Sequence, residues 1–142
     1  MLRRISKLAA LALSLGPAVA AADATTLDVE VIGAMPASGT VEISLFRSEE
    51  MFLKEADFQQ QCKPSDEGVC SVRFLLALPG DYAVVVAHDA NDNQKLDNGF
   101  LGFGAERFAY SNNASNPLFG RASFDDVKIE VSGETRITID LD

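Results

Sequence analysis

A dense run of side-chain oxygens follows an apolar stretch in the middle of the chain. Aspartate and asparagine recur at every second position at Asp89, Asn91 and Asn93, and a further carboxylate follows at Asp97. In a tight loop, side chains at this spacing converge on one point, which the backbone carbonyl of Lys95 would also face. Calcium takes about six to eight hard oxygen ligands in such loops. The spacing therefore predicts a Ca²⁺-binding loop.

The ligand set of this loop differs from the usual one at two positions. Gln94 stands where calcium loops have a glycine, and Phe100 stands where they have a bidentate glutamate. Glu106, in the next segment, could supply the missing carboxylate. The alternative is a turn without a metal, held by hydrogen bonds from its own aspartate and asparagine side chains to the backbone.

His88, the only histidine, comes directly before this loop. Alternation along a strand places it on the face opposite Asp89, so the adjacent pair cannot act together as a dyad. We interpret His88 as a buried, hydrogen-bonded residue, satisfied in the core or bonded to the segment 111–113. The alternative is a small metal-dependent hydrolase that uses His88 with Asp89, Asp97 or Glu106, although no glycine-flanked nucleophile is visible.

The residues before the loop have the pattern of a buried strand. The stretch 82–88 is β-branched and small, with apolar side chains on both alternating faces, which is typical of a strand in the middle of a sheet. Pro79 and Gly80 precede it and suit the two central positions of a type II turn.

Alternation of apolar and polar residues predicts the other strands, and we expect the first two of them to pair as a hairpin. Ser48, followed by two glutamates, predicts a short helix or helical turn that ends before Pro64. The stretch 100–116 has no clear period. Six or seven short strands with hardly any helix predict an all-β fold, a single β-sandwich with a small barrel as the alternative. The alternating stretches are 27–31, 41–45, 72–76, 127–131 and 137–141.

The N-terminal residues have the pattern of an export signal. Three basic residues precede an apolar run at 8–15, and Ala18-Val19-Ala20 offers a cleavage site. The apolar run is too short to span a bilayer. We therefore predict a signal peptide over 1–22 and one β-sandwich domain over 23–142. The mature protein should be periplasmic or secreted, with no membrane insertion after the signal is cleaved.

The net charge of the chain limits the classes of partner that it can bind. The formal net charge is −9, and it becomes −12 when the three basic residues of the leader are removed. An acidic surface without a basic cluster argues against nucleic acid and against anionic membranes, and is compatible with binding cations.

Cys62 and Cys70 are the only cysteines, and both lie in the exported part. An oxidising compartment favours a disulfide between them, with two free buried thiols as the alternative. The spacing is not C-x-x-C and no histidine lies nearby, which argues against a redox or zinc site.

Several uncommon residues agree in order and spacing with a known family signature. The series resembles the family called domain of unknown function 2141, whose members are uncharacterised exported bacterial proteins. The resemblance implies an exported immunoglobulin-like or transthyretin-like β-sandwich, here of about seven strands with one short helical turn, and no established activity. The chain departs from the family at Gln94, Gly104, Arg107 and Ala109. The matching residues are Leu78-Pro79-Gly80 with Tyr82, then His88-Asp89, Asn91, Asn93, Lys95 and Asp97, then Leu101-Gly102, Glu106 and Ser111-Asn112-Asn113.

These observations favour a non-enzymatic binding or envelope-accessory module, whose partner would be an extracytoplasmic protein or a glycan. The alternatives are the hydrolase described above and a purely structural domain. An enzyme needs a concave pocket in which His88 and a carboxylate converge. A binding module should instead expose an aromatic patch, for which the candidates are Phe100, Phe103, Phe108 and Tyr110.

Overall fold

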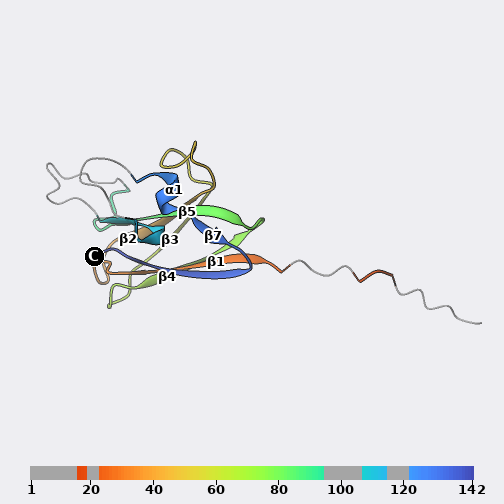
Figure 1. Cartoon of the computed structure of the whole chain (residues 1–142). Helices are drawn as coiled ribbons and strands as arrows, with labels where there is room; N and C mark the ends of the chain where they lie inside the picture. The colour runs from red at the N-terminus through yellow and green to blue at the C-terminus, as the bar shows by residue number, and fades with distance from the viewer. Residues whose placement is uncertain (1–15, 19–22, 95–106, 115–121) are drawn as a thin grey trace, which may run out of the picture.

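The computed structural model describes residues 16–18, 23–94, 107–114 and 122–142. Within them, eight strands form two layers. One layer has the strand order β4-β1-β8. The other has the order β3-β2-β5-β6, and β7 pairs with β5 there. The two layers face each other in Figure 1, which confirms the predicted all-β sandwich. The strands are β1 (Thr25–Ile32), β2 (Thr40–Phe46), β3 (Phe58–Cys62), β4 (Cys70–Leu76), β5 (Gly80–Asp89), β6 (Phe108–Tyr110), β7 (Ile129–Val131) and β8 (Glu134–Asp140).

The main core fills the space between the two sheets. Each strand contributes alternate residues to it, because side chains on a strand point to opposite faces. Leu27, Val29 and Val31 of β1 are fully buried, and Val41 and Ile43 of β2 meet them from the other layer. The period-two alternation in the sequence therefore identified the inward-facing rows correctly.

A second apolar cluster covers the outer face of the sheet that contains β5. Phe52 lies at its centre, with ring centroids 5.4 Å from Phe46 and 5.9 Å from Phe124. Phe124 belongs to the short helix α1 (Phe124–Val127), which lies over β5 on the outside of the sandwich in Figure 1. Because both of its faces are covered here, β5 has apolar residues on both faces, as the sequence predicted for a central strand.

The predicted hairpin between the first two strands is wrong. β1 pairs with β4 and β8, whereas β2 pairs with β3 and β5 in the other sheet. The connection between β1 and β2 crosses from one layer to the other, so these strands meet through their core side chains. Alternation shows that a strand has one buried face, but it does not identify the strand beside it.

The segment that begins at Ser48 forms turns and then a strand. The Ser48 hydroxyl accepts a hydrogen bond from the Met51 N–H at 3.4 Å, as a helix cap would. Leu53 then adopts a φ of +59°, which ends the helical turn, and β3 occupies the second half of the predicted segment. The glutamine-rich sequence of β3 lacks the apolar alternation that would have revealed it.

Three further local features differ from the sequence predictions. Gly80 has a φ of +151° and is already the first residue of β5, so it is not the second central residue of a type II turn. The aperiodic stretch contains β6 and the short 3₁₀ helix η2 (Ser111–Asn113). The start of the predicted strand 127–131 belongs to helix α1 instead, because Ser123 and Asp126 form a capping box at the N-terminus of this helix.

Among the described residues, no helix has the length and apolarity needed to cross a membrane.

Candidate functional site

The described part of the candidate loop, residues 89–94, is called the Asp89 loop. It begins at Asp89, the last residue of β5, directly opposite the start of β2. Asp89 and Thr40 are cross-strand partners. Gly39 lies against the loop so closely that a Cβ atom there would be 2.1 Å from the Asp89 carbonyl oxygen, and its φ is +67°. The Ser38 hydroxyl donates to the Ala90 carbonyl at 3.2 Å. The connection before β2 therefore supports the first two residues of the loop, and only glycine fits at position 39.

The loop closes around the carboxylate of Asp89. The Asn93 N–H donates to Asp89 Oδ1 at 3.2 Å and the Gln94 N–H donates to Asp89 Oδ2 at 2.7 Å. The Asn91 side-chain oxygen also accepts from the Asn93 N–H, at 3.1 Å. Gln94 has a φ of +60°, the left-handed conformation for which calcium loops use glycine. The chain thus makes the tight turn of such a loop although Gln94 replaces the glycine.

The structure brings part of the predicted ligand set together. Asp89, Asn91 and Asn93 lie in one turn, whereas Lys95, Asp97 and Glu106 lie outside the described residues. No group of three or more His, Cys, Asp or Glu side chains that could hold a metal occurs in the part of the chain that the structure describes. The turn has the side-chain-to-backbone bonds of the metal-free alternative. A carboxylate has about four lone-pair sites, however, so two N–H bonds to Asp89 leave room for a cation.

Asp92 points to the strands beside the loop. Its carboxylate accepts hydrogen bonds from the Thr40 hydroxyl at 2.5 Å and from Lys63 Nζ at 3.1 Å. The hydrogen bond from Thr40, followed by that from Lys63, holds the pKa of Asp92 below its ordinary value of 3.8. Sequence reasoning missed Thr40 and Lys63, because only the strand register shows that they flank the loop.

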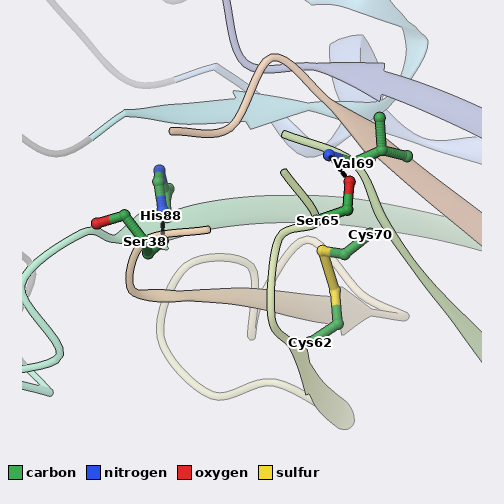
Figure 2. Close-up of a disulfide and its surroundings, with 6 residues drawn as sticks. All are labelled: Ser38, Cys62, Ser65, Val69, Cys70 and His88. Atoms are coloured by element: carbon green, nitrogen blue, oxygen red, sulfur yellow. Dashed lines mark hydrogen bonds between the residues drawn. A yellow bond between two sulfur atoms is a disulfide. The ribbon is translucent and has the colours of Figure 1, made fainter. Parts of the chain in front are cut away.

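His88 is buried, with 2 % of its surface exposed. Its Nδ1 accepts from the Met35 N–H at 3.4 Å, and its Nε2 lies 2.8 Å from the Ser38 carbonyl oxygen. Because a backbone N–H can only donate, this arrangement assigns the proton to Nε2, which donates to the Ser38 carbonyl. Figure 2 shows the contact between His88 and Ser38. The predicted buried and satisfied histidine is confirmed. Its partners lie in the connection before β2 and not in the segment 111–113, which was the other alternative.

Cys62 and Cys70 form the predicted disulfide, with Cα atoms 6.0 Å apart. The bond joins the end of β3 in one sheet to the start of β4 in the other (Figure 2). In the loop between them, the Ser65 hydroxyl accepts from the Val69 N–H at 3.2 Å. The disulfide therefore closes the sandwich along the side that also carries Lys63.

The Ser111-Asn112-Asn113 part of the signature has a structural role. Ser111 is 1 % exposed, and its hydroxyl accepts from the Val84 N–H at 2.9 Å and donates to the Val127 carbonyl at 2.7 Å. Asn112 has a φ of +61°, which asparagine tolerates better than most residues. Its side chain donates to the Asp126 carbonyl at 3.2 Å. These bonds join β5 to α1 through η2.

The described candidates for an aromatic patch lie in the second cluster. Tyr110 is buried, and Phe108 is half-buried with its ring centroid 5.7 Å from that of Tyr110. The expectation of an exposed patch is therefore wrong for Tyr110. Phe100 and Phe103 lie outside the described residues.

Comparisons with known proteins identify the family of the chain. The family model "Uncharacterized protein conserved in bacteria (DUF2141)" matches residues 29–139. The chain belongs to this family. No curated protein matches the DUF2141 chain. It is similar to the solved structure of a DUF3823 family protein from Parabacteroides merdae, with 12 % identity over 85 % of this chain and a TM-score of 0.35. This chain spans about half of that structure, 47 % of its length.

A shallow hollow of the DUF2141 chain lies on the outer face of the other sheet. Arg73 makes a two-bonded ion pair with Asp28 at 2.6 and 2.8 Å, and Arg136 approaches the same carboxylate at 3.6 Å. The hydrogen bond from Arg73 lowers the pKa of Asp28. Glu30, Ser71, Val29 and Val72 also line it. This hollow holds neither His88 nor the Asp89 loop, and exposed ion pairs of this kind contribute little to stability.

Proposed function

We propose that this DUF2141 protein is an exported, non-enzymatic β-sandwich module of the cell envelope, and that its Asp89 loop binds Ca²⁺. The observation that carries the proposal is the closed turn around Asp89. It has a left-handed residue at the position of the calcium-loop glycine and places the Asp89, Asn91 and Asn93 side chains in one turn. These are hard oxygen donors, which suit calcium better than zinc or copper.

Export is supported by two independent features. The N-terminal residues have a basic start, a short apolar run and an A-x-A site. The Cys62–Cys70 disulfide forms and persists in an oxidising compartment such as the periplasm or the extracellular space.

The hydrogen bonds of His88 weaken the hydrolase alternative. Both of its ring nitrogens have hydrogen-bond partners inside the fold, and the side chain faces the core. A general base needs a nitrogen within reach of a substrate proton. Neither His88 nor Asp89 lines the hollow described above. The hydrolase is therefore a weaker hypothesis than the binding module.

The cation would give the loop its function by linking it to the segment that follows. The Lys95 carbonyl, Asp97 and Glu106 would complete the oxygen set begun by Asp89, Asn91 and Asn93, and would fix the segment between β5 and β6. That segment, rich in phenylalanine and glycine, would then present a surface to an extracytoplasmic protein or a glycan. Extracellular calcium modules bind with Kd values of about 10⁻⁴ to 10⁻³ M.

Thermal unfolding with and without calcium tests this function. Millimolar calcium should stabilise the wild type by about 1 kcal/mol, which raises the Tm by a few degrees, and a chelator should reverse the rise. Magnesium should do less, because it demands a tighter octahedral site.

Asp89→Ala should lose the calcium response, and so should Asp89→Asn, which keeps a side-chain acceptor but lacks the charge. Asp66→Ala, at an exposed aspartate in the disulfide loop, is the matched control and should keep the response. If calcium shifts the Tm of wild type and Asp89→Ala equally, or shifts neither, the calcium proposal is wrong.

A further inference from the structure

Three side chains form a hydrogen-bonded cluster that joins the Asp89 loop to its neighbours: Thr40 at the start of β2, Lys63 directly after β3, and Asp92 in the loop itself. The Thr40 hydroxyl donates to Asp92 Oδ1 at 2.5 Å and accepts from Lys63 Nζ at 2.6 Å. Lys63 Nζ also donates to both oxygens of Asp92, at 3.3 and 3.1 Å. We call this cluster the Asp92 clamp and define it by Thr40, Lys63 and Asp92.

Two members of the clamp are fixed by the fold. Thr40 is the first residue of β2 and lies opposite Asp89 in the sheet. Lys63 directly follows Cys62, which pairs with Val41 of β2 and carries the disulfide. The clamp therefore ties the middle of the loop to a strand start and to the disulfide-bonded side of the sandwich.

The clamp also separates the two carboxylates of the loop. Asp92 is bonded to Thr40 and Lys63, whereas Asp89 is bonded to the N–H groups of Asn93 and Gln94. The ammonium of Lys63 offsets the charge of Asp92 next to the site. Without these partners, Asp92 would repel Asp89 and the left-handed turn at Asp92, with its φ of +54°, would lose its support.

We infer that the Asp92 clamp is a positioning network that sets the calcium affinity of the Asp89 loop. The inference rests on the proposed function, since it concerns the same loop. Thr40 and Lys63 would contribute no ligand to the ion. They hold the loop in its closed shape beforehand, so that less ordering remains to be done when calcium binds.

Calorimetric calcium titration of Thr40→Val tests the inference. Valine keeps the shape of threonine and every charge of the protein, but removes the hydroxyl at the centre of the clamp. Losing hydrogen bonds of ordinary strength should weaken calcium binding by about three- to tenfold. Thr138→Val is the matched control. It changes an exposed threonine of β8 in the other sheet, and its affinity should equal that of the wild type.

Lys63→Met separates positioning from simple charge repulsion. If Lys63 acted only by its charge, removing it would tighten calcium binding, because a cation next to the site would be gone. The clamp predicts weaker binding instead, with the affinity restored in Lys63→Arg. Lys63 is 69 % exposed, so these variants should fold, and a calcium-free melting curve checks that they do.

The outcomes separate this inference from the proposed function. A wild type that gives no heat with calcium overturns both. A wild type that binds calcium, with Thr40→Val at the same affinity or Lys63→Met at a higher one, overturns the clamp alone.

Discussion

Two asparagine-containing segments follow neighbouring strands of the same sheet and differ in what their polar atoms do. Residues 90–94 follow β5, and η2 follows β6; both contain left-handed residues, such as Gln94 and Asn112. In η2, the Ser111 hydroxyl is buried and bonded to two backbone groups of other elements. In the Asp89 loop, residues 91–94 are exposed, and Asp89 bonds to the backbone of its own turn.

The difference shows why a motif of polar residues does not by itself identify a site. The Ser111 hydroxyl replaces a partner from β6. The pairing of β5 with β6 ends at Val85, and the N–H of the neighbouring Val84 donates to the Ser111 hydroxyl. A buried N–H requires such a partner. The loop after Asp89 has no such task inside the core. Residues 91–94 are exposed, and of the two segments this is the one that we propose binds an ion.

The largest effect is expected where the fold supports the Asp89 loop. Gly39→Ala places a Cβ 2.1 Å from the Asp89 carbonyl oxygen and strains a φ of +67°, and it should destabilise the protein by about 3 kcal/mol. Gly133→Ala is the control, because Gly133 has a φ of +56° but nothing within 4 Å of the added atom. It should cost about 1 kcal/mol. Urea unfolding curves measure both, and equal losses would contradict the close approach.

Ser111→Ala should have the next largest effect and should not depend on calcium. The variant leaves the Val84 N–H and the Val127 carbonyl buried without their partner, which should cost about 2 kcal/mol. The loss should be the same with calcium and with chelator, measured by urea unfolding. Ser71→Ala, at an exposed serine of β4, is the control and should change stability by less than about 0.5 kcal/mol. A Ser111→Ala loss that calcium restores would assign the segment to the binding site.

The smallest effects concern the left-handed residues of the two segments. Gln94→Gly should stabilise the calcium-free protein by about 0.5 to 1 kcal/mol, because glycine adopts a φ of +60° without strain. Asn112→Gly should give no such gain, because asparagine already tolerates this conformation and its side chain bonds to the Asp126 carbonyl. Paired melting curves measure the difference, and an unchanged or less stable Gln94→Gly would contradict the loop geometry.

The sequence predicted features that depend on local patterns. The inward rows of β1 and β2, the burial of β5 on both faces, the disulfide and the burial of His88 all follow from spacing or composition, and all are confirmed. The turn after Asp89 was predicted as one of two alternatives, with or without a metal. Its shape is now described, and its occupancy remains a prediction.

The features that the sequence did not predict depend on the register between distant segments. The pairing of β1 with β8 joins the two ends of the domain, and β3 was missed because three consecutive glutamines show no apolar alternation. Thr40 and Lys63 could not be assigned to the loop, since their contact with Asp92 follows from the pairing of β2 with both β3 and β5. Such pairings are set by the core as a whole.

The most direct test of the account is a calcium titration of the ¹⁵N-labelled protein followed by NMR. The backbone N–H signals of Asn93 and Gln94, which bond to Asp89, should shift and saturate with a Kd of about 10⁻⁴ to 10⁻³ M. The signal of Val84, bonded to Ser111, should stay in place. If the Asn93 and Gln94 signals do not move at several millimolar calcium, or if Val84 shifts as much as they do, the Asp89 loop is not the calcium site.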